Sequence, residues 1–232
     1  MVLATDDLRA AMIAAAEQQL IASSDNDIAT RAVCEAVGVT QPVLYRLFGD
    51  KRGLLDALAD QGLERYAAVK AAQEETADPV ADLRAGWDGH LEFAGQHPAL
   101  YQLMFVPRPW SRSRARERVF GLLVSTLVRC AASGALTIEP DLAAQLILSA
   151  NVGVALNQIA QPALFDDAEL SHRMREAVLG HLLVDPGDPG PGSPLKAAAL
   201  RLRSQLTLSG AGALDPAESA LLDRWLQRIT QP

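Results

Sequence analysis

The side chains best suited to recognition chemistry are concentrated between residues 28 and 56. Gln41, Tyr45 and Arg46 bring an amide, a phenol and a guanidinium to one short stretch, beside the apolar Val43. Other apolar residues are spaced to pack two short helices against each other and against their neighbours: Val33, Val37, Val39, Leu44 and Phe48. That packing leaves the first group facing outward. The pattern predicts a helix-turn-helix, in which the second helix can enter a DNA major groove.

Capping and turn residues delimit the two short helices that present this face. Thr30 is a natural N-cap for a helix over about 31–36. Gly38 can supply the chain reversal because glycine accepts a positive φ without penalty. Thr40 is a good N-cap for the second helix, which has Pro42 in its first turn, where a missing N–H does no harm. We expect this second helix to end near residue 48.

The rest of the chain is also expected to be helical. Alanine and leucine dominate, most glycines and prolines fall between the periodic segments, and no segment shows convincing period-two alternation. Besides the two short helices, we expect helices over 8–22, 51–75, 80–96, 99–106, 112–132, 140–160, 167–184, 195–208 and 216–229. A Pro- and Gly-rich stretch over 185–194 reads as an exposed linker. The predicted fold class is therefore all-α.

The composition is that of a soluble globular protein. The chain has 232 residues, of which 49% are hydrophobic and 21% charged, with a net charge of −7. This is too apolar for a disordered chain and too well charged for a membrane protein. The most apolar stretch, 142–161, is interrupted by asparagines and glutamines, so we expect a buried or interface helix there and no membrane contact. The N-terminal residues do not resemble a secretion signal, and two isolated cysteines fit a reducing cytoplasm.

Patterns for catalysis and metal binding are missing from the sequence. There is no Gly-rich phosphate loop, no Gly-x-Ser-x-Gly elbow and no Cys–His pairing, so we expect no enzymatic activity and no cofactor. The histidines show no metal-ligand spacing, and we expect no metal site; they are His90, His97, His172 and His181. The sequence therefore favours binding over catalysis.

Three pieces of the helix-turn-helix segment carry a family pattern. They are Thr30-Arg31 through Gly38-Val39, then Gln-Pro-x-Leu-Tyr at 41–45, then Lys-Arg-x-Leu-Leu at 51–55. At these positions the chain resembles the DNA-binding domain of TetR-family transcriptional regulators, and the last two pieces look most like the tetracycline-repressor branch. The likeness is specific over about 8–60 and generic over the remainder.

The resemblance implies DNA-contacting roles for nine residues: Thr30, Arg31, Thr40, Gln41, Pro42, Val43, Tyr45, Arg46 and Lys51. Gln41 would read a base, and Arg31 would reach a base edge or a phosphate. Pro42 and Val43 would contact thymine methyl groups. The phosphate contacts would come from Thr30, Tyr45 and Lys51. Because Val43 replaces a residue that is usually small or hydroxylic, and residues 46–47 lie where the family varies most, the operator sequence cannot be transferred from a relative.

The N-terminal segment is acidic overall. Residues 1–60 hold five Lys or Arg against nine Asp or Glu, a net charge of −4, so non-specific DNA affinity should be weak. All of these basic residues except Arg9 lie within the motif. A second basic cluster is either a solvated helix start or an auxiliary contact for DNA phosphate or an acidic ligand. It consists of Arg108, Arg112, Arg114, Arg116 and Arg118.

Large side chains gather between residues 87 and 120, where they form either ordinary core or the lining of an apolar cavity. The group comprises Trp87, His90, Leu91, Phe93, Tyr101, Met104, Phe105, Trp110 and Phe120. If a cavity exists, the expected ligand contacts are Trp87, His90, Tyr101, Met104, Phe105 and Asn151. An apolar helix is interrupted by Asn151, Asn157 and Gln158. These side chains would form hydrogen bonds with a ligand or pair across a dimer interface.

These features lead to one expected function and one alternative. We expect a cytoplasmic homodimeric repressor that leaves double-stranded operator DNA when a small apolar or aromatic ligand binds. Since one short recognition helix covers few base pairs, specificity needs two half-sites, and the helices over 140–160 and 167–184 have the apolar content for a dimer interface. The alternative is a ligand-independent dimeric DNA-binding or interaction protein.

The expected domains follow the same reasoning. Residues 1–60 would form the helix-turn-helix DNA-binding domain, 61–184 the helical ligand-binding and dimerisation domain, and 185–232 the linker and a C-terminal helical extension. We expect this extension to dock on the core of its own or the partner subunit. The side chains it would bury are Leu200, Leu206, Leu221, Leu222 and Trp225.

Overall fold

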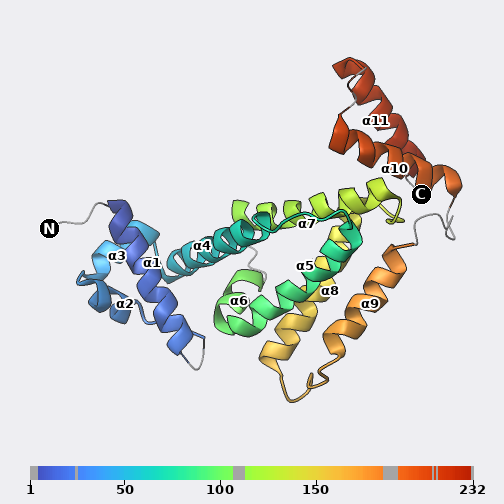
Figure 1. Ribbon diagram of the computed structural model, residues 1–232. Coiled ribbons are helices and arrows are strands. Elements are labelled where there is room, and N and C mark those ends of the chain that lie inside the picture. Colours follow the sequence, from blue (N-terminus) through green and yellow to red (C-terminus); the bar gives the residue numbers. More distant parts are fainter. Residues whose placement is uncertain are drawn as a thin grey trace. The chain divides into compact units, whose positions relative to one another are not determined.

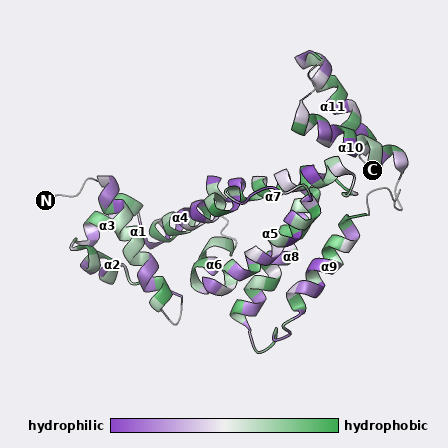
Figure 2. Cartoon of the chain, in the orientation of Figure 1, coloured by the Kyte–Doolittle hydropathy of each residue, from purple (hydrophilic) through white to green (hydrophobic). Residues whose placement is uncertain are grey.

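A computed structural model of the chain describes residues 5–23, 26–106, 113–184, 193–210, 212 and 214–230. Within these residues the chain forms helices joined by short connections, and the one β-type pairing is an isolated bridge between Leu136 and Leu183 (Figure 1). The all-α prediction is confirmed. Hydrophobic and hydrophilic residues are interspersed along the helices, as amphipathic packing requires (Figure 2).

The helices agree closely with the predicted segments. Their bounds are α1 Thr5–Ala22, α2 Thr30–Val37, α3 Gln41–Phe48, α4 Lys51–Ala71, α5 Pro79–Gln96, α6 Pro98–Phe105, α7 Arg114–Ser133, α8 Pro140–Ala160, α9 Leu170–Leu182, α10 Pro194–Ser209 and α11 Pro216–Thr230. The largest differences are that α4 ends four residues earlier than residue 75, α9 begins three residues later than residue 167 and α1 begins three residues earlier than residue 8. All three differences lie at helix ends, where propensity alone places a boundary poorly.

The chain divides into two compact units, which are not consecutive stretches of sequence. The first contains Met1–Ala72 and Phe93–Val119, and the second contains Gln73–Glu92 and Phe120–Pro232. Helices α5 and α7 each contribute residues to both units.

In the first unit, α1 packs against α2, α4 and α6, and α3 packs against α2 and α4. Its buried side chains include Met12, Leu20, Val33, Leu44, Leu54, Leu58 and Leu63. Helix α6 approaches α4 closely at Gly62, where a Cβ atom would lie 2.9 Å from the sulfur of Met104. The absence of a side chain at Gly62 therefore allows α6 to pack tightly on α4.

The second unit has one main hydrophobic core, built from α5, α7, α8, α9 and α10. Its buried members are Leu83, Trp87, Leu127, Cys130, Ala131, Leu136, Ala143, Ala144, Ile147, Leu179, Leu182 and Leu200. Helix α8 is long and apolar enough to cross a membrane by length and composition, but it supplies three residues to this core. Only 33% of its most apolar window is buried within the chain, which leaves much of its surface uncovered.

The C-terminal helices α10 and α11 pack on each other, and α10 packs on the core of the second unit, to which it belongs. Leu200 belongs to the core, Arg203 donates to Glu139 at 2.8 Å, and Gln205 donates to the carbonyl of Ala132 at 3.2 Å. The prediction that Leu221 and Trp225 are buried is wrong for the single chain, because these side chains are 42% and 53% exposed. The linker residues 185–192 lie outside the described part of the chain.

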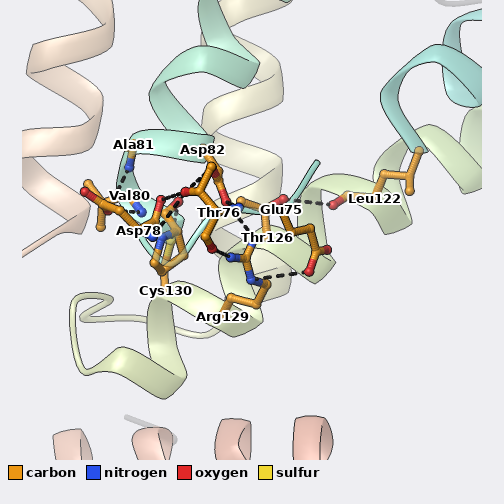
Figure 3. Close-up of polar contacts among 11 residues, drawn as sticks. Glu75, Thr76, Asp78, Val80, Ala81, Asp82, Leu122, Thr126, Arg129 and Cys130 are labelled. Carbon is orange, nitrogen blue, oxygen red and sulfur yellow. Dashed lines mark hydrogen bonds and ion pairs between the residues drawn. The ribbon is translucent and has the colours of Figure 1, made fainter. Parts of the chain in front are cut away.

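The connection between α4 and α5 is held to α7 by a polar network (Figure 3). Arg129 on α7 donates to Asp82 at 2.8 Å and also to the backbone carbonyl of Thr76. Thr76 in turn donates to Asp82 at 2.7 Å, and these bonds hold the pKa of the Asp82 carboxyl below its usual value. These bonds hold the segment between α4 and α5 to α7 within the second unit.

Candidate nucleic-acid interface

A tight glycine turn sets the geometry of α2 and α3. Gly38 ends α2 with a φ of 73°, a left-handed conformation that glycine adopts without strain. Its N–H donates to the carbonyl of Glu35 at 3.2 Å, and the N–H of Val39 donates to that of Cys34 at 3.0 Å. Val33 and Leu44 are fully buried between the helices, as the sequence pattern predicts.

The opposite face of α3 is open to solvent. Gln41, Pro42 and Arg46 are exposed, and Tyr45 is 44% exposed although it is a large aromatic residue. Val43 is half-buried, so it faces outward less fully than the other four. An exposed helix face that combines an amide, a phenol and a guanidinium fits insertion into a major groove.

Two threonines lie at the starts of these helices. The prediction that Thr30 is the N-cap of α2 is wrong, because Ala29 occupies that position and Thr30 is the first helical residue. The hydroxyl of Thr30 instead accepts a hydrogen bond from Gln41 Nε2 at 3.4 Å, which joins the start of α2 to the start of α3. Thr40 is the N-cap of α3, as predicted, but its side chain makes no capping hydrogen bond.

Two basic residues of this face, Arg31 and Lys51, are paired with carboxylates. Arg31 Nε lies 2.8 Å from Glu35 Oε1 one turn along α2. Lys51 Nζ, at the first residue of α4, lies 2.6 Å from the carboxylate of Asp27. The hydrogen bond from Lys51 holds the pKa of Asp27 below its usual value, so Asp27 is ionised at neutral pH.

Three residues that were not predicted from the sequence also contact the site: Arg9, Asp27 and Glu35. Arg9 on α1 places its guanidinium 4.6 Å from the centre of the Phe48 ring, at the end of α3. This contact depends on how α1 packs in the unit, which no local pattern reveals. Asp27 is equally non-local to Lys51, whereas the spacing of four between Arg31 and Glu35 is visible in the sequence.

Two described residues of the second basic cluster form bonds with other residues of the first unit. Arg116 donates to the backbone carbonyl of Met104, and Arg118 pairs with Glu64 at 3.0 Å. Arg114 is exposed at the start of α7. Arg108 and Arg112 lie outside the described residues.

The structure places the six candidate ligand contacts in two different units. Tyr101, Met104 and Phe105 on α6 belong to the first unit, where Tyr101 and Phe105 stack at 4.5 Å between ring centres. Burial raises the pKa of the Tyr101 phenol, which keeps it neutral. The other three candidates, Trp87, His90 and Asn151, belong to the second unit. Trp110, which the sequence analysis grouped with them, lies outside the described residues.

Trp87 and Asn151 meet in a buried hydrogen-bond chain. The indole N–H of Trp87 donates to the Ser171 hydroxyl at 3.0 Å, and Asn151 Nδ2 donates to the Trp87 carbonyl at 3.3 Å. Asn151 is only 4% exposed, and its Oδ1 has no hydrogen-bond partner within the described part of the chain. Because an unsatisfied buried acceptor is costly, this oxygen is suited to a bound donor.

Two family models match the chain. The model for bacterial regulatory proteins of the tetR family matches residues 12–58, which contain α2 and α3. The model for the tetracyclin repressor-like C-terminal domain matches residues 83–207, which is more than half of the chain. No curated protein matches the chain.

Several solved structures share the fold. A protein of unknown function from Rhodococcus sp. RHA1 is 24% identical, with a TM-score of 0.62 over 76% of this chain and 96% of that one. A TetR-family transcriptional regulator from Agrobacterium tumefaciens is 18% identical, with a TM-score of 0.57 over 78% of this chain and 100% of that one. NalD, the secondary repressor of the MexAB-OprM multidrug efflux pump in Pseudomonas aeruginosa, is 18% identical, with a TM-score of 0.50 over 78% and 100%. At these identities, the matches show that the chain shares the fold of these structures.

Proposed function

Since the chain belongs to the tetR family of bacterial regulatory proteins and is therefore a transcriptional regulator, we propose that it is a homodimeric repressor that a small ligand releases from operator DNA. The exposed face of α3 carries this proposal, because Gln41 and Tyr45 project from a short helix that a tight turn fixes against α2. The protein acts on double-stranded DNA in the cytoplasm and needs no membrane. NalD is a repressor, which agrees with the proposal that this chain represses transcription.

The nine residues named from the family pattern divide by role. Gln41 reads a base, and Pro42 and Val43 contact thymine methyl groups. Arg31 and Arg46 reach bases or phosphates. Thr30, Tyr45 and Lys51 contact phosphates, and Thr40, at the start of α3, supports these contacts.

The dimer forms through α8 and α9. Leu142 and Leu146 on α8 are 49% and 44% exposed, and Met174 on α9 is 36% exposed. These side chains lie on helices that pack along each other, so a second copy can cover both at once. A two-fold axis there presents two copies of α3 to two half-sites of a palindromic operator.

The ligand acts in the second unit around Trp87 and Asn151. Its body is apolar or aromatic to match this core, and it donates a hydrogen bond to Asn151 Oδ1. His90, which is also buried, is a second polar contact. Tyr101, Met104 and Phe105 pack on α4 in the first unit and respond to the movement of that helix.

The release step follows from the path of the chain. Helix α4 begins at Lys51, beside the DNA-facing residues, and its continuation at Thr76 is anchored to α7 by Arg129. A ligand that favours a conformation in which α4 is tilted changes the spacing of the two recognition helices, to which half-site binding is intolerant. A ligand that bound both conformations equally would change nothing.

The alternative is a dimeric DNA-binding protein that responds to no ligand. The close packing of the candidate contacts favours it: Trp87 is 2% exposed, and Tyr101 and Met104 are fully buried. A screen of hydrophobic small molecules by Trp fluorescence, followed by operator-binding assays, separates the two functions. Compounds that bind the protein and cause it to dissociate from the operator support the ligand-controlled repressor. Compounds that bind tightly but leave the protein–operator complex intact refute the coupling between ligand binding and DNA release.

Selection of bound sequences from a random duplex library, with the purified full-length protein, tests the DNA-binding function. We expect enrichment of a palindrome whose half-sites lie about one helical turn, roughly 34–36 Å, apart. Failure to enrich any sequence would contradict the proposed function.

A further inference from the structure

We propose that the carboxylates of Asp27 and Glu35 compete with DNA phosphate for Lys51 and Arg31, and so keep the affinity for random DNA low. The proposal rests on the proposed function, which assigns those two cations to DNA. It adds two acidic residues that contact the site without binding DNA themselves.

The geometry places each carboxylate in competition with DNA phosphate. The Asp27 carboxylate lies 2.6 Å from Lys51 Nζ, and Glu35 Oε1 lies 2.8 Å from Arg31 Nε. Both distances are those of charge-assisted hydrogen bonds. A phosphate oxygen would use the same N–H groups at the same distance. DNA must therefore displace or share each carboxylate before these cations can contact it.

Helix stability does not explain why these pairs are present. Arg31 lies in the first turn of α2 and Lys51 is the first residue of α4, which are the ends where the helix dipole disfavours a cation. Glu35 lies toward the C-terminal end of α2, where the dipole disfavours an anion. The Arg31 and Glu35 side chains are 83% and 64% exposed, and such exposed pairs contribute little to folding.

Charge balance explains what the pairs do. Random DNA attracts a protein mainly through phosphate neutralisation, which depends on the number of cations free to replace counterions. Asp27 and Glu35 each cancel one cation at the face that meets DNA. An operator adds base contacts from Gln41, so it is bound where random DNA is not.

Asp27→Asn and Glu35→Gln test the proposal by measured affinity for a random-sequence duplex at several salt concentrations. Each substitution should raise the affinity about two- to fivefold, the range that one exposed ion pair can supply. The slope of log affinity against log salt should become more negative by up to about 0.9 for each carboxylate removed. The double variant should combine both effects, and Asp27→Glu, which keeps the charge, should stay near the wild type.

Glu64→Gln is the matched control. Glu64 pairs with Arg118 at 3.0 Å, the Arg118 and Glu64 side chains are 54% and 50% exposed, and neither belongs to the helix-turn-helix. This variant changes the net charge equally and should leave the affinity nearly unchanged. An equal gain in affinity for Glu64→Gln would overturn the proposal, since the effect would then come from net charge alone.

The same substitution in a Lys51→Ala variant tests whether Asp27 acts through Lys51. In Lys51→Ala protein, Asp27→Asn should lose its effect, because no ammonium remains for the carboxylate to hold. A gain that persists there would overturn the role of Asp27, and unchanged affinity in both single variants would overturn the proposal as a whole. These results are distinguishable from failure of the proposed function, in which the wild-type protein would bind neither the selected operator nor random DNA.

Discussion

Gln41 and Lys51 begin successive helices, yet their side chains have different chemistry. The Gln41 amide is exposed and reaches Thr30 Oγ1 at 3.4 Å, a weak bond that a base edge can replace. The Lys51 ammonium is a point charge that any phosphate satisfies. At the scale of single residues, sequence reading and general attraction to DNA should therefore separate cleanly.

The first prediction compares these two residues. Gln41→Ala should cost about 1–3 kcal/mol of operator binding and relax the preference at one base position. Lys51→Ala should weaken binding to all sequences alike and make the salt slope shallower by less than about 0.9, because Asp27 already cancels part of the Lys51 charge. Binding to a library of operator variants measures both effects. Uniform loss of affinity in both variants would show that Gln41 does not read a base.

The second prediction concerns the thiol of Cys130. Burial raises its pKa to about 12, and its sulfur donates to the Pro79 carbonyl at 3.4 Å. In a Cys34→Ala variant, iodoacetamide at pH 8 should label the folded protein about a thousandfold more slowly than the urea-unfolded protein, because the thiolate is the reactive form. The thiol of the unfolded chain has the ordinary pKa of about 9.0, whereas the folded thiol stays protonated, so this group lowers stability as the pH rises above 9.0. Rapid labelling of the folded protein would show that the site is open.

At the scale of elements, the turn between α2 and α3 depends on a backbone conformation rather than on contacts. Nothing lies within 4 Å of a Cβ built on Gly38, so its positive φ is the main obstacle to a side chain there. The docking of α10 depends instead on burial, chiefly of Leu200. We therefore expect substitutions or truncations at these two elements to destabilise the protein for different reasons.

The third prediction is that Gly38→Ala destabilises the helix-turn-helix by about 1 kcal/mol, the cost of a left-handed conformation for a residue with a Cβ. Thermal unfolding should show a decrease of about 2–4 °C. Gly95→Ala is the control, because Gly95 is exposed in α5 with open space around its Cβ and no positive φ. It should be neutral or slightly stabilising. Equal losses in both variants would contradict a conformational cause.

The fourth prediction concerns the C-terminal helices. A chain that ends at Val184 lacks Leu200 and the Arg203–Glu139 ion pair, so it should lose about 1.5–3 kcal/mol from the leucine alone. A chain that ends at Gly210 keeps α10 and should melt close to the full-length protein. Identical melting of the shorter chain and the full-length protein would show that α10 does not stabilise the second unit.

At the scale of the whole molecule, the exposed leucines of α8 belong to the proposed dimer interface. Leu146→Glu should raise the dimer dissociation constant by at least about tenfold, because the interface would bury an unpaired carboxylate. Val69→Glu, at a position 65% exposed on α4, is the matched control and should leave dimerisation unchanged. Analytical ultracentrifugation measures both. A wild-type monomer at micromolar concentration that still binds operator would refute the dimer.

The sequence by itself determined the helical fold and the recognition motif, because both follow from local rules. Helix periodicity and breakers located the helices to within a few residues, and the buried pattern of Val33 and Leu44 identified the face that Gln41 and Tyr45 present. Gly38 was recognisable because a tight turn needs a positive φ. These properties depend on neighbours only a few residues away.

Only the tertiary structure decided which distant groups meet. The pairing of Lys51 with Asp27, the position of Arg9 against Phe48 and the anchoring of Thr76 by Arg129 all depend on helix packing, which no local spacing encodes. For the same reason, the candidate ligand contacts fall into two units although Trp87 and His90 are close in sequence to Tyr101. Burial of Leu200 but not of Trp225 was likewise decided by which helix reaches the core, since both residues have the same apolar signal in the sequence.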